Sequence, residues 1–330
     1  MIATDAKAVR LPSPSAGPPI QLRGLHRWFG ETHAVNNVDF DVRAGEVFGF
    51  IGPNGAGKTT SMRILATLDE PSAGDAYVDG FSVVDDPERV RARLGFMPDY
   101  FGTYKNINVR EYLDFFARAY GLRGADRRAA VSFSMDFTGL NPLARKEIDS
   151  LSKGMKQRLC LGRTMIHDPS VMVLDEPAAG LDPRARIELR EMIDRLAELG
   201  KAVLISSHIL TELAEICDRV GIIENGRLVA VGSVDEIGKR VGEEKIVRLR
   251  VLGDQSKCLD WLEARDGVEE ARVTPIGIVF TFHGEQDAVD ESLAALLGDL
   301  VNAGYGVLEF TTKTKSLEDV FLHVTTGEAE

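Results

Sequence analysis

Residues 47–60 read VFGFIGPNGAGKTT, an apolar run followed by a glycine-rich loop, a lysine and two threonines. The run Val47–Ile51 has the length and composition of a buried β-strand. The loop after it fits the pattern G-x-x-x-x-G-K-[ST], in which backbone N–H groups cradle phosphate oxygens. A strand that leads through such a loop into a helix is the P-loop arrangement. The sequence therefore predicts an α/β fold built around a phosphate site.

The loop offers several kinds of group to the phosphates of a nucleotide. Its glycines allow a tight turn with inward N–H groups, and the N-terminus of the next helix adds partial positive charge. Lys58 is expected to reach the β- and γ-phosphates, and Thr59 to bind magnesium through its hydroxyl. The residues predicted to surround the phosphates are Gly52, Pro53, Asn54, Gly55, Ala56, Gly57, Lys58, Thr59 and Thr60.

A second stretch, VMVLDEP at residues 171–177, supplies carboxylates. Four apolar residues form a buried strand, and Asp175 follows at its end, where magnesium needs a carboxylate. Glu176 is then placed to orient or deprotonate an attacking water. Two adjacent carboxylates favour hydrolysis over a small-molecule kinase reaction, because a kinase needs a second acceptor site that the sequence does not reveal.

Strand-like and helix-like segments alternate between residues 20 and 236, which predicts one nucleotide-binding domain with a mainly parallel sheet. A mostly helical insert is expected at about 90–166. Its stripe of apolar residues at helical spacing, from Val109 to Tyr120, is typical of packing. Residues 1–19 are rich in Pro, Ser and Ala, and we expect a disordered tail there.

The remaining residues, 237–330, have the order β-α-β-β-α-β, the ferredoxin-like pattern of a small α+β domain. A last helix is expected to begin at Ser316. The whole fold class is thus α/β with a mixed sheet core and a helical subdomain, followed by this C-terminal accessory domain.

Composition limits the classes of protein that fit. The 330 residues are 44% hydrophobic, but no apolar run approaches the roughly 20 residues that span a bilayer. The formal net charge is −12, whereas non-specific nucleic-acid binders carry a basic balance or patch. We therefore expect no nucleic-acid partner and, at most, peripheral membrane association.

Taken together, the motifs resemble those of the ATP-binding cassette (ABC) ATPases, over about residues 20–234. Beyond the two stretches above, AGLDP at 179–183 is similar to the family's D-loop, and LSKGM at 151–155 to its signature motif. ISSHIL at 205–210 puts His208 at the position of the switch histidine, which contacts the γ-phosphate. Phe29 matches the aromatic residue that stacks on adenine, with Trp28 as the alternative.

The resemblance implies ATP and Mg²⁺ as cofactors and a dimer of two cassettes, identical or related. Lys58, Glu176 and His208 would be catalytic. Ser152 and Gly154 would close over the ATP of the facing cassette, with a hydroxyl, a free N–H and a helix N-terminus. Asp182 of the D-loop motif would make a dimer contact.

Three positions depart from the family pattern. Lys153 replaces a glycine of the signature motif and Met155 its glutamine, and Asp99 stands where the family has the Q-loop glutamine. Asp99 could still hold magnesium or a water, as a third metal ligand beside Thr59 and Asp175. Because the acidic strand and His208 are intact, we expect hydrolysis.

These departures, and the ending SLEDVFLHV, resemble the ATPases of ABC-2-type and drug-resistance exporters. The resemblance implies an ATPase subunit at the cytoplasmic face of the cell membrane, which drives export through separate membrane permease subunits. Those subunits would dock on the helical insert, near Asp99 and Tyr104. The alternatives are a soluble ABC ATPase that acts on ribosomes or DNA, and a regulatory ATP-binding module with impaired hydrolysis.

Overall fold

The computed structural model describes residues 17–100, 102, 106–209, 213, 215–233, 236–237, 244–283 and 289–314. Within them the chain forms two compact units, divided between Val231 and Gly232. Tyr104, the helix expected at Ser316 and most of the tail expected at 1–19 lie outside the described residues. Each unit is described separately.

The N-terminal unit begins with a four-stranded antiparallel sheet in the order β2-β1-β4-β5. Its strands are β1 Ile20–Phe29, β2 Thr32–Val42, β4 Ala73–Val78 and β5 Phe81–Ser82. The inward residues of β1 are Ile20, Leu22 and Leu25, all at most 1% exposed. The sequence had suggested a mainly parallel sheet, so this separate antiparallel sheet is an addition to the prediction.

A six-stranded sheet follows, in the order β10-β9-β3-β8-β7-β6. Its strands are β3 Val47–Ile51, β6 Leu94–Met97, β7 Val171–Leu174, β8 Ala202–Ser207, β9 Arg219–Glu224 and β10 Arg227–Ser233. The pairs β3–β8, β3–β9, β6–β7 and β7–β8 are parallel. Every residue of β3, β7 and β8 is buried, as expected for parallel strands covered on both faces.

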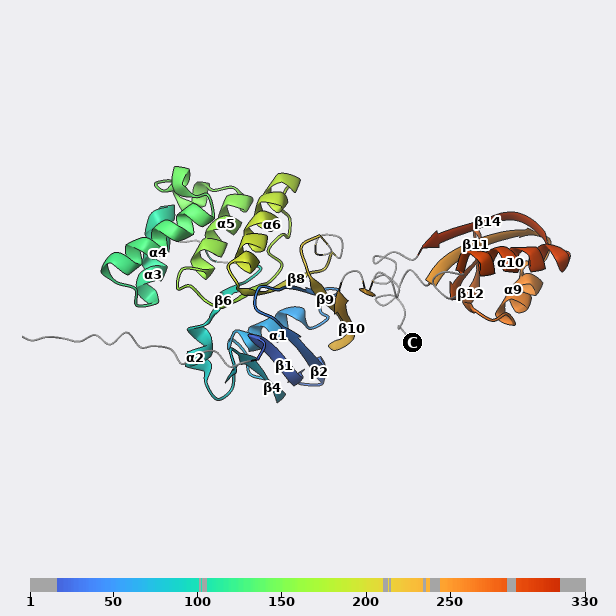
Figure 1. The fold of residues 1–330 in the computed structure, drawn as a ribbon, viewed down its shortest axis with the longest axis horizontal. Helices are drawn as coiled ribbons and strands as arrows, with labels where there is room; N and C mark the ends of the chain where they lie inside the picture. The colour runs from blue at the N-terminus through green and yellow to red at the C-terminus, as the bar shows by residue number, and fades with distance from the viewer. Residues whose placement is uncertain are drawn as a thin grey trace, which may run out of the picture. The chain divides into compact units, whose positions relative to one another are not determined.

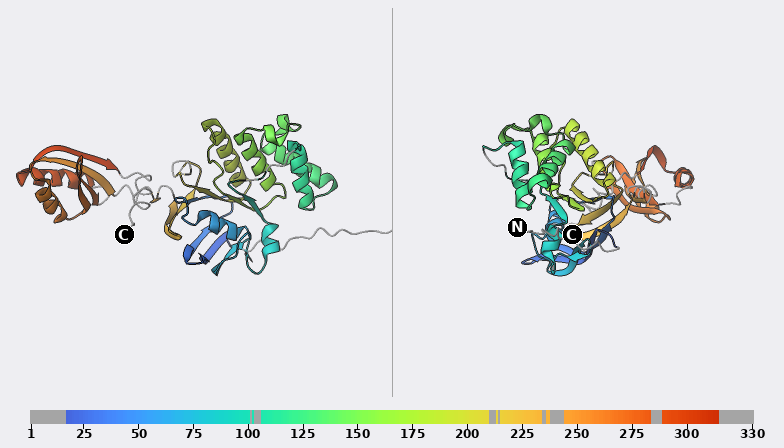
Figure 2. Two further views of the ribbon diagram at one scale, coloured as in Figure 1. Left: turned by 180° about the vertical axis from the view of Figure 1, so that it is seen from behind. Right: turned by 60° about the vertical axis from the view of Figure 1, so that its left-hand side comes forward.

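Helices cover both faces of the six-stranded sheet (Figure 1). Helix α1, Lys58–Leu65, lies between the two sheets and contributes Met62, Ile64 and Leu65 to the main core. Helix α6, Pro183–Glu198, and helix α5, Lys153–Thr164, lie on the opposite face of the sheet, as the view from behind also shows (Figure 2). The short helix α2 spans Pro87–Arg91.

The insert expected at 90–166 contains one strand of the sheet, β6, and is helical from Val109 onward. Its elements are α3 Val109–Ala119, α4 Gly124–Phe137, the 3₁₀ turns η1 Asn141–Leu143 and η2 Ile148–Ser150, and α5. Tyr112 and Leu113 of α3 are fully buried in an apolar cluster that is formed within the insert and is separate from the main core. The apolar stripe is therefore packing, as the sequence indicated.

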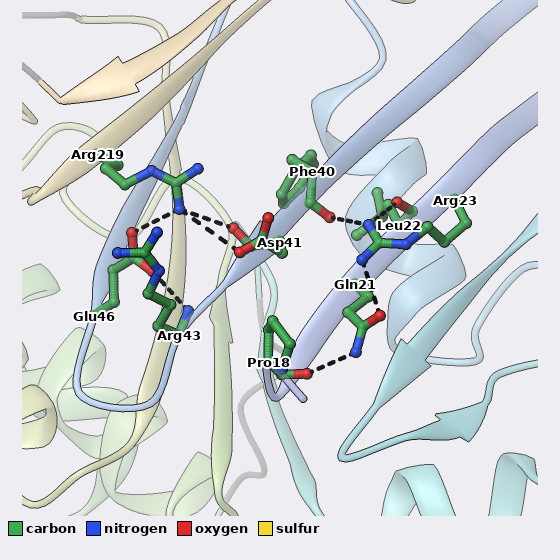
Figure 3. Close-up of polar contacts among 9 residues, drawn as sticks. All are labelled: Pro18, Gln21, Leu22, Arg23, Phe40, Asp41, Arg43, Glu46 and Arg219. Carbon is green, nitrogen blue, oxygen red and sulfur yellow. Dashed lines mark hydrogen bonds and ion pairs between the residues drawn. The ribbon is translucent and has the colours of Figure 1, made fainter. Parts of the chain in front are cut away.

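Arg219 at the start of β9 ties the two sheets together where β2 leads into β3 (Figure 3). Its Nη1 lies 3.1 Å from Glu46 Oε1 and 3.4 Å from the carbonyl oxygen of Asp41. The other oxygen of the buried Glu46 carboxylate accepts a hydrogen bond from Arg43 N at 2.6 Å. This contact fixes the entry into β3, the strand that carries the P-loop.

Residues 244–283 and 289–314 of the C-terminal unit form a four-stranded antiparallel sheet in the order β12-β13-β11-β14 with helices α9 and α10. Its elements are β11 Glu244–Leu252, α9 Gln255–Glu263, β12 Val268–Thr274, β13 Gly277–His283, α10 Val289–Asn302 and β14 Gly306–Thr314. Its core includes Leu249, Leu262, Phe280 and Leu296, from both strands and helices. The predicted fold class, with a ferredoxin-like C-terminal part, is confirmed.

Candidate active site

The P-loop between β3 and α1 takes a backbone path that excludes side chains at two glycines. A Cβ on Gly52 would lie 2.2 Å from the carbonyl oxygen of Ile223. Gly57 has φ 106°, and a Cβ there would lie 2.4 Å from the carbonyl oxygen of Ala34. Glycine is therefore required at both positions for the loop to close against its neighbours.

The other loop residues are distributed between a buried base and an exposed tip. Asn54 and Gly55 are exposed, with Gly55 at φ 86°, whereas Ala56 is buried. The carbonyl oxygen of Ala56 accepts a hydrogen bond from Gly226 N at 3.0 Å, in the tight turn between β9 and β10. Thr60 lies in the first turn of α1 and is half-buried.

Lys58, the first residue of α1, has a side chain folded back over the loop. Its Nζ donates to the carbonyl oxygens of Gly52 at 2.6 Å and Pro53 at 3.1 Å, and lies 3.6 Å from Glu176 Oε1. Burial lowers the pKa of Lys58, and the Glu176 carboxylate opposes that shift. The ammonium is thus held beside the loop and the acidic strand end, where phosphates would lie.

Asp175 follows β7 and is 1% exposed. Ser206 of β8 donates to Asp175 Oδ1 at 2.6 Å and accepts from Glu176 N at 2.9 Å. Burial raises the pKa of Asp175, the hydroxyls of Ser206 and Thr59 oppose the rise, and the Asp99 carboxylate reinforces it. Thr59 and Asp99, the other two residues predicted to bind the metal, therefore both affect the pKa of Asp175.

The residues present fit a magnesium ion. Asp175 Oδ2 and Glu176 Oε1 are buried, and neither has a hydrogen-bond partner among the described residues. An unpaired buried carboxylate oxygen is costly, and magnesium prefers such oxygens together with hydroxyls and water. The Thr59 hydroxyl is near enough to lower the pKa of Asp175 by hydrogen bonding, which makes these two residues the best candidate ligands.

Glu176 and His208 meet because they follow neighbouring parallel strands, β7 and β8. His208 Nδ1 lies 2.9 Å from Glu176 Oε2, and the imidazole is 42% exposed. Glu176 has φ 47°, a left-handed conformation that is uncommon for a residue other than glycine. Backbone strain of this kind is concentrated at functional sites. All three residues predicted to be catalytic thus lie together, with Glu176 between Lys58 and His208.

The signature residues belong to a different part of the unit. Ser152 caps α5, and its Oγ accepts a hydrogen bond from Met155 N at 3.3 Å. Gly154 packs so closely on α6 that a Cβ would lie 3.0 Å from Ala185 Cβ. Helix α5, whose N-terminus carries Ser152 and Gly154, and helix α1, which follows the P-loop, cover opposite faces of the sheet (Figure 1).

The two substitutions in the signature motif have identifiable surroundings. Met155 packs on the apolar cluster of the helical insert. Lys153 points at the AGLDP turn, since a Cβ on Gly180 would lie 2.4 Å from its Nζ. In the same turn Asp182 caps α6, with its Oδ1 accepting from Ala185 N at 2.9 Å. The predicted dimer contact Asp182 therefore also has a local role.

Both candidate adenine partners are exposed at the end of β1. Phe29 is 47% exposed, and the Arg27 guanidinium lies 4.4 Å from its ring centroid. Trp28 is 41% exposed and stacks on His33, with 4.1 Å between ring centroids. Phe29 remains the residue that the family resemblance favours for stacking on adenine.

Ser206 was missed in the sequence, although its hydroxyl contacts both members of the acidic pair. A signal was present, because Ser206 is a small polar residue at the end of an otherwise apolar strand. Its role depends on the pairing of β8 with β7, which places the Ser206 side chain against Asp175.

Comparison with known proteins agrees with this geometry. The sequence profile described as ABC transporter matches residues 35–179. A Nod factor export ATP-binding protein I of Ralstonia nicotianae is 33% identical over 322 residues, which cover 96% of this chain and 97% of that protein. The chain belongs to the ABC transporter family. It is an ABC-type ATPase.

Other similar proteins extend the comparison. The linearmycin resistance ATP-binding protein LnrL of Bacillus subtilis is 27% identical over 306 residues, which cover 93% of this chain and 98% of that protein. A solved ATP-binding subunit of an ABC transporter superposes with a TM-score of 0.61 at 30% identity, over 68% of this chain and 93% of the other. A dimeric bacterial ABC transporter cassette superposes with a TM-score of 0.59 at 25% identity, over 65% and 98%.

Proposed function

We propose that this ABC ATPase drives export through separate membrane subunits. The observation that carries the proposal is the position of Glu176, whose carboxylate lies 2.9 Å from His208 Nδ1 and 3.6 Å from Lys58 Nζ. That arrangement supports turnover, and so argues against a regulatory module that only binds ATP. The names of the relatives, which concern resistance and Nod factor export, support an export role.

The residues divide the reaction between them. Lys58 and the loop N–H groups hold the β- and γ-phosphates. Thr59 and Asp175 would hold magnesium, which would supply positive charge against the charge that develops on the phosphates. Glu176 takes the proton of the attacking water as general base. His208 fixes the orientation of the Glu176 carboxylate and contacts the γ-phosphate. Phe29 stacks on the adenine ring.

A complete site is proposed to need two cassettes, either two copies of this chain or this chain and a relative. Ser152 and Gly154 would bind the γ-phosphate in the facing site, with Asp182 at the contact between the two. The separation of α5 from α1 in one chain supports this arrangement, as does the dimeric form of the similar bacterial cassette. Closure on two ATP molecules and reopening after hydrolysis would then form the power stroke.

The membrane subunits are proposed to dock on the helical insert, at the cytoplasmic face of the membrane. No helix in the described part of the chain is long and apolar enough to cross a membrane. A groove of about 580 Å³ runs along α3, and its lining includes three arginines, two carboxylates and the half-exposed Phe115. Arg118 Nε lies 2.7 Å from Asp114 Oδ2, so part of this charge is paired within the groove. This lining suits a short helix that carries both polar and apolar side chains.

Affinity purification of the chain from its native membranes in mild detergent tests the export role. The expected result is a membrane protein with several spans, recovered in near-equal amount. Recovery with ribosomes or DNA, or as a soluble protein alone, would contradict the proposal. The same purification with Phe115→Ala and Arg118→Ala in the groove should lose the membrane protein while ATP hydrolysis is retained.

A further inference from the structure

Gln157 is a buried polar side chain in α5 that the proposed chemistry does not use. It is 6% exposed, and its Nε2 donates a hydrogen bond to the carbonyl oxygen of Pro177 at 2.8 Å. Pro177 directly follows Glu176, the proposed general base. Helix α5 is therefore hydrogen-bonded to Pro177, the residue that follows the proposed general base.

Three hydrogen bonds hold the backbone of Glu176 and Pro177. Glu176 N donates to Ser206 Oγ at 2.9 Å, and the Glu176 carbonyl oxygen accepts from Ala179 N at 3.1 Å. Proline has no N–H, so its carbonyl is the backbone group by which Pro177 itself is anchored, and Gln157 binds it. Glu176 has φ 47°. A residue in that conformation persists only where its surroundings fix it, and the bond from Gln157 is the one of the three that comes from α5.

The same helix carries the signature residues at its N-terminus. Its first turns contact the segment after Pro177 at further points: Lys153 lies against Gly180, and Gly154 against Ala185. Arg158 Nη1 lies 3.4 Å from Glu188 Oε2 of α6. Since α5 is a continuous helix, a shift of Pro177 would be passed along it to Ser152.

We propose that Gln157 is a positioning residue for hydrolysis, which acts through Glu176 and links it to the signature end of α5. The inference rests on the proposed function. The amide of Gln157 keeps the Glu176 carboxylate aimed at His208 and at the attacking water. In a dimer it also couples the hydrolytic site of one cassette to the helix that contacts ATP in the facing site.

Gln157→Met tests the proposal, because methionine has nearly the same length and volume but cannot donate to the carbonyl. The turnover number for ATP should fall about tenfold, the loss expected for one buried hydrogen bond to a catalytic segment. The dissociation constant for ATP should stay within about twofold, because Gln157 touches none of the proposed nucleotide ligands. If the wild-type protein responds cooperatively to ATP, its Hill coefficient should move toward 1 in the variant.

Thr164→Val is the matched control. Thr164 is also a buried polar residue of α5, but its hydroxyl donates to the carbonyl oxygens of Cys160 at 2.8 Å and of Phe96 in β6 at 3.5 Å, and not to the segment after β7. The control should keep the wild-type turnover number and Hill coefficient. Gln157→Asn, which keeps an amide but is one methylene shorter, should reproduce the loss seen with Gln157→Met.

Several results would overturn the proposal. A turnover number for Gln157→Met within about twofold of the wild-type value would contradict the positioning role. A parallel loss of ATP binding and melting temperature in both Gln157 variants would make the residue merely structural. A wild-type Hill coefficient of 1, or one unchanged by the substitution, would remove the coupling. If the wild-type dimer itself releases no phosphate, the proposed function fails instead, which separates the two claims.

Discussion

The site contains buried charged side chains, whose desolvation lowers the stability of the folded protein. Asp175 is 1% exposed and Lys58 is 5% exposed, although side chains of these types are almost always solvated. The ammonium has two carbonyl partners, whereas one oxygen of Asp175 lacks a hydrogen-bond partner among the described residues. Such an arrangement is unfavourable without ligand, and it becomes favourable when magnesium and phosphates supply the missing partners.

Asp175→Asn should therefore raise stability while it removes activity. Without nucleotide or metal, the melting temperature should rise by a few degrees, because a buried charge is replaced by a neutral amide that can still bond to Ser206. Magnesium-dependent hydrolysis should fall by about a hundredfold or more, since the ion stabilises transition-state charge by several kcal/mol. Thermal unfolding and phosphate release on the same samples measure both effects.

The difference in melting temperature between Asp175→Asn and the wild-type protein should change with pH in one direction. The pKa of Asp175 is raised above its ordinary value of 3.8, so the folded protein holds this proton more tightly than the unfolded chain. The stabilising effect of Asp175→Asn should be full at neutral pH and shrink as the pH falls through the raised pKa. A difference in melting temperature that grows on acidification would contradict the burial argument.

At the scale of single elements, α5 has an N-terminus that is proposed to serve two purposes. Ser152 caps the helix within one chain and is proposed to bind the γ-phosphate of the facing site. A capping role alone predicts a loss of stability, whereas a role in the facing site predicts a loss of turnover. The two can be separated by substituting this cap and a comparable one.

Ser152→Ala should destabilise the fold by about 1 kcal/mol, as for other N-caps, and should also reduce ATP turnover by tenfold or more. The matched control is Asn108→Ala, which removes the capping box of α3 and should cost similar stability with little effect on turnover. Denaturant unfolding gives the first quantity and phosphate release the second. Equal effects of the two substitutions on turnover would show that Ser152 is only a cap.

Elements that depend on local sequence were predictable, and elements that depend on distant pairing were not. The strand, loop and helix from Val47 to Leu65 follow from adjacent residues, because glycine spacing and an apolar run specify them locally. The antiparallel sheet that contains β1 and β4 was missed. Its pairs β1–β2 and β4–β5 are local, but the sheet forms only because β1 pairs with β4, and the P-loop and α1 lie between these two strands in the sequence. The strand β6 was absorbed into the helical insert because its sequence, LGFM, contains a glycine and no β-branched residue, whereas the equally short β7, VMVL, has two valines.

In the candidate site, too, residues within short motifs were predictable, whereas residues that act through distant contacts were not. Lys58, Asp175 and Glu176 stand in motifs whose chemistry is legible in a few consecutive residues. The partners Ser206 and Gln157 stand in no such motif, and only the polar end of an apolar strand marks Ser206. Their roles come from the pairing of β7 with β8 and from the packing of α5 on the loop after Pro177. Sequence therefore indicates which groups perform the chemistry better than which groups hold them in place.

At the scale of the whole molecule, the two units have separate hydrophobic cores. The main core of the first unit draws on residues such as Phe50 and Met62, and that of the second on residues such as Leu249 and Phe280. Each core is assembled within its own unit. The sequence predicted the boundary between residues 236 and 237, with the nucleotide-binding residues all on the N-terminal side.

A chain that ends at residue 236 should therefore fold and bind ATP with the affinity of the full chain, within about twofold. Its thermal unfolding should be a single transition, and residues 237–330 expressed alone should give a second one. Calorimetry and nucleotide titration make the measurement. An N-terminal fragment that aggregates or loses ATP binding would contradict the predicted division into domains.

The central claim is that ATP is hydrolysed at the site formed by Lys58, Asp175, Glu176 and His208. Phosphate release and ATP binding, measured on purified wild-type protein and on Glu176→Gln, test it most directly. The wild-type protein should release phosphate, and the variant should bind ATP with unchanged affinity but turn over about a hundredfold or more slowly, as expected for loss of a general base. Equal rates of release from the two proteins would contradict the assignment of Glu176 and the mechanism built on it.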